Sequence, residues 1–343
     1  MSKKIALIGI TIILFIFNCF KKQDHDILVP KTPIYNISGT VYCSVSHQTI
    51  PDADVILTGE VKYNEEDTSR TIQFYAETDE NGVYTFTDVP ANFTYEITAS
   101  KTGYFPQSVE CNFTYTNRNA DDIILGKLLV IQNEYQYEDV DIKGLTHKDK
   151  NIWIADGKNS QLIEFDESME IKRSIRFPNY HLFALEWDGE WFWTSDYYKK
   201  VIIQFQIIAE DSIEIYSLYP LPNSLEDEGQ VYTINDFAYL KSIFWACARE
   251  ATEIFIKLLL DYPNSIYVSY YDIPMQFAKG IEVTDDTLYL VCQHGAEARM
   301  YLLNRPTMES SAFYVVPNGA GMTKFDETGI WVATGNKITQ YSF

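Results

Sequence analysis

The sequence predicts an all-β protein made of two consecutive folded modules, and three observations lead to this prediction. The 343 residues include 25 Tyr, 20 Phe and 6 Trp, besides many Val, Ile and Thr, and these types suit pleated, half-buried surfaces. The segment 34–126 consists of short apolar-alternating stretches that are separated by turn residues. Between residues 127 and 343, one short segment recurs five times. A hydrophobic content of 46% is ample for two packed cores.

Residues 1–18 have the features of an export signal. The basic start MSKK precedes the apolar run IALIGITIILFIF, which is too short for a comfortable membrane span. The run ends at IFNCFKKQ, where Ile16 and Asn18 precede Cys19 in a pattern that resembles a relaxed bacterial lipoprotein box. The resemblance implies cleavage before Cys19 and attachment of two or three acyl chains, which anchor a protein stably. An uncleaved anchor and plain secretion are the alternatives, and residues 19–33 are expected to form a tether.

The first module, 34–126, is expected to contain a hairpin at TDENGVYTFTDVP, because Gly82 can take positive φ in the turn that begins at Asp79. The stretches ISGTVYCSVSHQTIPDADVILTG, TDENGVYTFTDVP and YEITASKTGYFPQ resemble the carboxypeptidase regulatory-like domain. This resemblance implies a prealbumin-like β-sandwich of about seven strands without catalytic residues. Asp79, Glu80 and Asn81 offer oxygen ligands for calcium, but the loop lacks the further carboxylates of a closed site, so turn formation is favoured.

Four cysteines follow Cys19, and an oxidising compartment would allow them to pair. Cys43 and Cys111 each alternate with apolar residues, so both are expected to face the interior of the first module. A disulfide between them is one prediction, and two buried thiols are the alternative. Cys247 and Cys292 lie at near-equivalent positions of the repeat and are expected to face opposite sides of their strands, so no bridge is predicted there.

The second module contains the segments NIWIAD, WFWTSD, IFWACA, TLYLVC and GIWVAT. Their shared aromatic position is occupied by Trp153, Trp193, Trp245, Tyr289 and Trp331, at intervals of 40, 52, 44 and 42 residues. Such intervals are typical of β-propeller blades. Each unit has an inner strand before the aromatic strand and a third strand after it. EATEIFIKLLLDY would also suit a helix, but its place in the repeat favours a strand.

The fifth unit ends at the C-terminus without a fourth strand. The segment KLLVIQNEYQY, residues 127–137, is β-like and precedes the first inner strand. We expect it to pair with Lys337–Phe343, so that an N-terminal strand closes a propeller of about five blades. The predicted domains are therefore a sandwich at 34–126 and a propeller at 127–343.

IWIADGKNSQLIEFD resembles the second and third strands of NHL, YVTN and SMP-30-like propellers. Enzymes of the SMP-30-like kind hold a metal on the axis, which makes Glu186, Asn235, Asp236 and Glu282 the nearest candidate ligands for a calcium-like ion. Any acidic propeller offers such residues, and those families more often have six or seven blades. We therefore predict no metal, cofactor or catalytic residue. Asp156 and Asp196 are expected to cap turns.

The net charge of -21 disfavours nucleic acid as a partner. Aromatic residues gather around the second unit, and Trp187, Trp191, Tyr197 and Tyr198 are candidates for stacking on a ligand. The alternative is that they fill the space between blades.

These observations predict a monomeric binding or scaffold lipoprotein of the cell envelope, held on the outer membrane or cell surface by its lipid. Its propeller would bind a glycan, peptide or protein. The alternative is a calcium-type metal-dependent hydrolase or lactonase of SMP-30-like type. A secreted eukaryotic protein is a third hypothesis, because sequons begin at Asn36, Asn92 and Asn112.

Overall fold

The computed structural model describes residues 33–61, 69–91, 93–112, 118–196, 198–221, 226–227, 230–231, 233–241, 243–249, 254–261, 265–272 and 278–343. All regular elements in these ranges are β-strands. These ranges contain no helix that is long and apolar enough to cross a membrane. The predicted export signal, Cys19 and the tether up to residue 32 lie outside the described residues, as do Tyr197 and Asn92.

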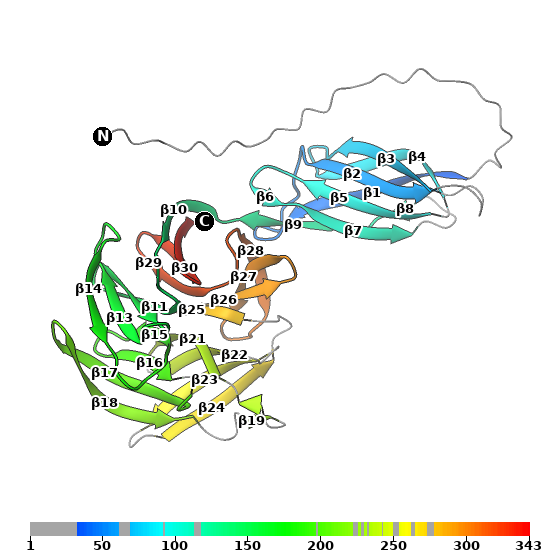
Figure 1. Cartoon of the computed structure of the whole chain (residues 1–343). Coiled ribbons are helices and arrows are strands. Elements are labelled where there is room, and N and C mark those ends of the chain that lie inside the picture. Colours follow the sequence, from blue (N-terminus) through cyan, green and yellow to red (C-terminus); the bar gives the residue numbers. More distant parts are fainter. Residues whose placement is uncertain are drawn as a thin grey trace, which may run out of the picture.

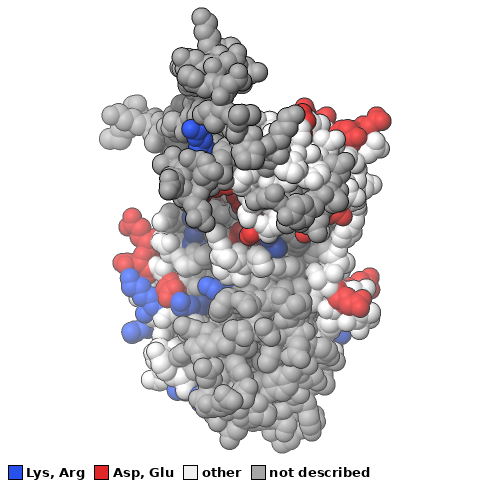
Figure 2. Space-filling model, turned by 90° about the vertical axis from the view of Figure 1, so that its right-hand side faces the viewer, with Lys and Arg blue, Asp and Glu red and all other residues white. Residues whose placement is uncertain are grey.

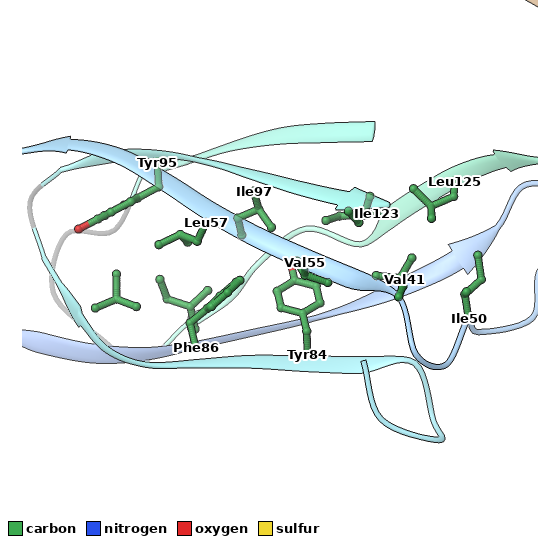
Figure 3. Packing of buried hydrophobic residues seen from close by; sticks show 14 of the residues in the cluster. Val41, Ile50, Val55, Leu57, Tyr84, Phe86, Tyr95, Ile97, Ile123 and Leu125 are labelled. Atoms are coloured by element: carbon green, nitrogen blue, oxygen red, sulfur yellow. The ribbon is translucent and has the colours of Figure 1, made fainter. Parts of the chain in front are cut away.

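The first module is a β-sandwich, as predicted (Figure 1). One layer contains β1 (Ile34–Cys43), β4 (Val83–Pro90), β8 (Arg118–Asn119), β9 (Ile123–Leu128) and the short β6 (Tyr104–Phe105). The other layer has the order β3 (Arg70–Glu77), β2 (Asp54–Val61), β5 (Thr94–Ser100) and β7 (Gln107–Asn112). Alternate residues of both layers point inward, so Tyr84 and Phe86 pack against Leu57, Tyr95 and Ile97 (Figure 3).

The turn at Asp79 is stabilised by its own side chain. Asp79 Oδ1 accepts hydrogen bonds from the backbone N–H groups of Asn81 and Val83, both at 2.9 Å, and Gly82 has φ of 72°. These are the features of a tight hairpin turn with an acidic first residue. The structure thus agrees with turn formation by the DENG sequence.

The predicted Cys43–Cys111 disulfide is wrong. Both residues are free thiols. Cys43 is paired with Leu125 at the end of β1, whereas Cys111 is paired with Tyr95 in the other layer. Alternation places both side chains on the interior face but does not determine their positions along the strands.

The second module consists of five sets of four antiparallel strands, which we number as blades 1 to 5 in chain order of their inner strands (Figure 1). Blade 1 contains β11 (Ile142–Lys148), β12 (Asn151–Asp156), β13 (Gln161–Phe165) and β14 (Ile171–Arg176). Blade 2 contains β15 (Leu182–Trp187), β16 (Phe192–Asp196), β17 (Val201–Ala209) and β18 (Ser212–Pro220). A small hairpin of β19 (Glu226–Asp227) and β20 (Gln230–Val231) follows.

Blade 3 contains β21 (Thr233–Leu240), β22 (Ile243–Arg249), β23 (Ile254–Asp261) and β24 (Ser265–Asp272), so the segment that would also suit a helix is a strand. Blade 4 contains β25 (Ala278–Val283), β26 (Thr287–His294), β27 (Glu297–Asn304) and β28 (Ser310–Val316). Blade 5 contains β29 (Met322–Asp326), β30 (Gly329–Thr334), β31 (Lys337–Ser342) and β10 (Val130–Gln136).

The ring closes as predicted, because β10 is the outer strand of blade 5. It pairs antiparallel with β31 from Val130 opposite Ser342 to Gln136 opposite Lys337. The five inner strands contact one another in the order β11, β15, β21, β25 and β29, and β29 also contacts β11. The first and last blades are therefore neighbours in the ring, and β10 covers the edge of β31 that could otherwise pair with another chain.

The sandwich and the propeller share a strand at their junction. β9 pairs with β1 of the sandwich, and its end pairs in parallel with β28, the outer strand of blade 4. The buried hydroxyl of Ser44 donates to the carbonyl oxygen of Phe313 at 2.7 Å and accepts from the N–H of Lys127 at 3.1 Å. The predicted domain boundary at residue 127 falls inside β9. A continuous sheet therefore connects the two modules instead of a free linker.

Charged side chains of both signs occur on the face of the molecule that Figure 2 shows. Figure 2 shows one face of the molecule, on which the acidic and basic side chains of the described residues form small separate groups. Such mixing fits the spread of charge along the sequence, which has 48 Asp and Glu against 27 Lys and Arg.

Candidate functional site

The propeller axis carries a ring of residues that the strand register defines. In each blade, the inner-strand residue opposite the repeated aromatic lies seven positions before it in the sequence. These residues, which we call the axial ring, are Thr146, Glu186, Ala238, Glu282 and Lys324. The ring thus contains two carboxylates and one ammonium group. Since it follows from the repeat, a count back from the aromatic in the sequence could have identified Lys324.

Lys324 is the basic member of this ring and is almost completely buried. Its Nζ donates a hydrogen bond to the carbonyl oxygen of Phe237 at 2.6 Å. The same atom lies 2.8 Å from Glu186 Oε2 and 3.8 Å from Asp236 Oδ1. Lys324 belongs to blade 5, whereas these partners belong to blades 2 and 3. One side chain therefore connects three blades across the axis.

Asp236 lies next to the ring, two residues before Ala238. Its Oδ2 accepts hydrogen bonds from the backbone N–H groups of Ile281 and Thr323, both at 3.1 Å, which belong to blades 4 and 5. The inner strands approach closely here, because a Cβ at Gly280 would overlap the carbonyl oxygen of Gly321. The glycines at these positions thus leave room for the Asp236 carboxylate, which is completely buried.

Other polar side chains near the axis also reach the next blade. Glu282 Oε2 accepts from the N–H of Phe325 at 3.1 Å, and Thr146 Oγ1 accepts from the N–H of Trp187 at 3.0 Å. Asn235 Nδ2 donates to the carbonyl oxygen of Ala278 at 3.2 Å. Each of these bonds satisfies a backbone group between inner strands, and buried backbone groups require such partners. Their first role is therefore to hold adjacent blades together.

Burial and mutual charge interactions change the pKa values of Glu186, Asp236 and Lys324. It raises the pKa of Glu186 to about 8 and that of Asp236 to about 7, although the nearby Lys324 ammonium acts in the opposite direction. Burial acts to lower the pKa of Lys324, but the carboxylates of Asp236, Glu186 and Glu282 outweigh it and raise that pKa above its ordinary value. Lys324 therefore stays charged, and its charge offsets part of the negative charge of the three carboxylates around it.

These residues do not fit a calcium-like ion. Three predicted ligands, Glu186, Asp236 and Glu282, do converge on the axis, but an ammonium group lies beside two of them and backbone N–H groups occupy oxygens of Asp236 and Glu282. A calcium ion needs six to eight oxygen ligands. Across the described residues, no group of three His, Cys, Asp or Glu side chains is arranged to hold a metal. The internal ammonium supplies the positive charge at this position.

A pocket of about 270 Å³ opens next to this cluster, where the inner strands begin. We call it the axial pocket. It is lined by Asp141, Ile142, Lys143, Phe183, Asn235, Lys279, Ala320, Gly321, Met322, Ala333, Thr334 and Gly335. Lys143 Nζ lies 3.0 Å from Asp141 Oδ2 and 5.5 Å from the ring centre of Phe183. The lining thus combines two ammonium groups, one carboxylate, an amide and apolar side chains.

A second cleft, of about 490 Å³, lies between blades 5 and 1 at the opposite ends of the inner strands. Tyr135 and Trp331 line it with their rings stacked at 6.3 Å. The Trp331 ring is nearly buried, and its indole N–H donates to Asp326 Oδ2 at 2.9 Å. The carboxylates of Asp166 and Asp326 hold turns through backbone N–H groups. The polar and aromatic groups of this cleft are therefore largely engaged in structure.

The structure does not bring the predicted aromatic candidates together. Trp187 packs on Phe192 with ring centres 4.7 Å apart, and Trp191 packs on Tyr216 at the same distance. Both tryptophans lie in or beside the turn before β16, whereas Tyr198 lies after β16, so they are at opposite ends of that strand. Tyr198 is 68% exposed. Packing within and around blade 2 therefore accounts for the two tryptophans, and their role in ligand binding stays a prediction.

The two repeated aspartates cap turns, as predicted. Asp156 Oδ1 accepts from the N–H groups of Asp141 and Lys158 at 3.1 and 3.0 Å. Asp196 accepts from the N–H of Lys199 at 2.6 Å and from that of His181 at 2.8 Å. Each carboxylate thus joins the turn after the second strand to the segment that enters the same blade.

Residues 36–124 match the family model of the carboxypeptidase regulatory-like domain. None of the curated proteins compared with the chain matches it. A solved glutaminyl cyclase of Myxococcus xanthus is similar with 12% identity and a TM-score of 0.46, over 62% of this chain and 95% of that chain.

A streptogramin B lyase shows 13% identity and a TM-score of 0.37, over 90% of this chain and 97% of that chain. A virginiamycin B lyase from Staphylococcus aureus shows 14% identity and a TM-score of 0.36, over 78% and 94%. None of these activities is carried over to this protein at such values.

Proposed function

We propose that this protein is a binding or scaffold lipoprotein of the cell envelope, whose axial pocket receives part of a glycan, peptide or protein ligand. One observation carries the proposal: the pocket is open, while the carboxylates near its base are compensated by Lys324 and by backbone N–H groups. An open pocket beside carboxylates that are already engaged by Lys324 and by backbone N–H groups supports binding. The described residues around the axis offer a metal-dependent hydrolase no free set of ligands.

The junction between the modules supports a scaffold role. The sandwich shares a sheet with blade 4, which fixes the orientation of the sandwich relative to the propeller. If Cys19 carries lipid, the sandwich would hold the propeller away from the membrane. Mass spectrometry of the mature N-terminus tests the anchor: we expect a diacylglyceryl-cysteine, and an unmodified start further along would contradict it.

The binding function is tested with the full-length protein in detergent on arrays of glycans and peptides. We expect saturable binding of one ligand class without chemical change of that ligand. If no glycan, peptide or extracted envelope protein binds, the proposal fails.

The metal-dependent alternative is tested by thermal melting in EDTA and in added calcium. We expect no shift of the melting temperature, because Lys324 provides the positive charge on the axis. A large shift would favour the hydrolase.

A further inference from the structure

We infer that the axial pocket binds a carboxylate group of its ligand, held between Lys143 and Lys279. This inference rests on the proposed binding function and specifies the chemistry of that site. Lys143 and Lys279 come from the inner strands of blades 1 and 4, and both line the pocket. In both strands the lysine directly precedes the glycine that packs against the neighbouring inner strand, which is Gly144 after Lys143 and Gly280 after Lys279. The two ammonium groups therefore stand at equivalent positions of the repeat, at the rim of the pocket.

The charged residues that line the pocket favour a ligand group with a single negative charge. Asp141, Lys143 and Lys279 are the charged residues among those that line the pocket, which leaves one positive charge in excess. Lys143 is already paired with Asp141 at 3.0 Å. Lys279 is exposed and forms no ion pair among the described residues. A carboxylate matches this excess, whereas a doubly charged phosphate would leave a negative charge uncompensated.

Among the described turns of the propeller, those at the end that holds the pocket carry fewer acidic residues than those at the opposite end. The described turns on the opposite face carry the acidic residues Asp149, Asp166, Glu167, Glu170, Asp188, Glu190, Glu210, Asp211, Asp285, Asp286, Glu309 and Glu327, against Lys150, Lys241 and Arg305. Those on the pocket face carry Glu138, Asp139 and Asp141 against Lys158, Lys199 and Lys200, and the connection from β18 to β21 adds Glu226 and Asp227. An anionic ligand is therefore repelled less at the pocket than at the other end of the axis.

The remaining lining residues provide groups for the rest of the ligand. Asn235 and Thr334 supply an amide and a hydroxyl, and Phe183 and Met322 supply apolar surface. Sites for drug-sized ligands have volumes of about 300–1,000 Å³. A pocket of about 270 Å³ therefore suits one residue, such as a sugar acid or the C-terminal residue of a peptide.

Calorimetric titration of the full-length protein in detergent tests this inference and separates the two sources of the carboxylate. The probes are glucuronate with glucose as its uncharged counterpart, and N-acetylglycine with its amide. We expect one acid to bind at least about tenfold more tightly than its counterpart, because the charge contact with Lys143 and Lys279 is lost in the neutral compound.

The variants Lys143→Met and Lys279→Met should each weaken binding of that acid by about tenfold or more. Lys158→Met is the matched control, because Lys158 lies on the same face outside the pocket and pairs with Asp139. Equal affinity for charged and neutral probes, equal weakening by Lys158→Met, or no binding of either acid while an array ligand binds normally would overturn the inference and leave the binding function intact. Failure of every array ligand would instead overturn the binding function.

Discussion

Replacing Lys324 with methionine should strongly destabilise the propeller. Methionine keeps an unbranched side chain of similar length, so the substitution removes the charge and the three N–H donors with little change of shape. It leaves the Phe237 carbonyl oxygen without this donor and the carboxylates of Glu186 and Asp236 without the adjacent ammonium. The effect therefore measures how far the internal cation holds blades 2, 3 and 5 together.

The contacts of Lys324 define the size of the effect. At an effective dielectric constant of about 20, unit charges about 3–4 Å apart attract each other by about 4–6 kcal/mol. Desolvation offsets much of this, and removal of one partner of a buried ion pair typically costs about 3–5 kcal/mol. Since domains of about 150–250 residues lose about 2–4 °C per kcal/mol, we expect the melting temperature to fall by about 10 °C.

The loss should depend on pH. The pKa values of Glu186 and Asp236 are raised to about 8 and about 7, above their ordinary values of 4.5 and 3.8. A carboxyl group whose pKa is raised by folding binds more protons in the folded state, so its contribution to stability falls as pH rises through the folded pKa. The protein should therefore lose stability between about pH 4 and pH 8. Without Lys324, the loss should be greater at pH 8 than at pH 5.

Calorimetric melting at pH 5 and pH 8 is the assay. Lys158→Met is the control, because its Nζ lies 2.7 Å from Asp139 Oδ1 but both side chains are more than half exposed, and exposed pairs contribute little. The double variant Lys324→Met/Glu186→Gln should recover part of the loss, since it removes an uncompensated buried carboxylate. An unchanged melting temperature of Lys324→Met at pH 8 would refute the reasoning.

Three further predictions concern the ring and the junction. Removing residues 338–343 deletes most of β31, the partner of β10, and should sharply lower the melting temperature; an unchanged value would contradict closure by the N-terminal strand. Gly280→Ala should destabilise the propeller by about 1–3 kcal/mol in urea unfolding, because its Cβ would overlap the carbonyl oxygen of Gly321, and an unchanged midpoint would argue against close packing at the axis. Ser44→Ala should cost about 1–3 kcal/mol, since the Phe313 carbonyl and the Lys127 N–H at the junction lose their partner, and we expect two calorimetric transitions for the variant against one for the native protein.

Much of the fold followed from local patterns. The repeated aromatics from Trp153 to Trp331 predicted five blades, and the β-like segment at 127–137 predicted the closing strand. The blade prediction succeeded because a blade is a chain of hairpins, whose strands are neighbours in sequence and alternate in a regular way. The closing strand is far from β31 in sequence, and it was predicted because the fifth unit lacks a fourth strand after Lys337–Phe343. Carboxylates near the axis were also predicted at Glu186, Asp236 and Glu282, since the register of a repeat carries from one blade to the next.

The sequence did not predict the partner of those carboxylates. When the five units are aligned from the start of the inner strand, the fifth unit carries one extra residue before its aromatic, so Lys324 falls out of register with Glu186 and Glu282. The charge of a lysine also gave no indication that this residue would be buried. In the same way, alternation placed Cys43 and Cys111 on interior faces but not at the same height in the sandwich. Positions along a strand depend on pairing with distant strands, which the local pattern does not contain.

The sequence alone thus determined the strand content, the order of the modules, the repeat and the residues at the aromatic level of each blade. The tertiary structure decided which of these residues meet: Lys324 with Glu186 across the axis, Asp236 with the N–H groups of blades 4 and 5, and β9 with both modules. The physical reason is that side-chain periodicity is fixed by the local backbone. Charge compensation and the joining of modules arise only when residues far apart in sequence are brought within a few ångströms of one another.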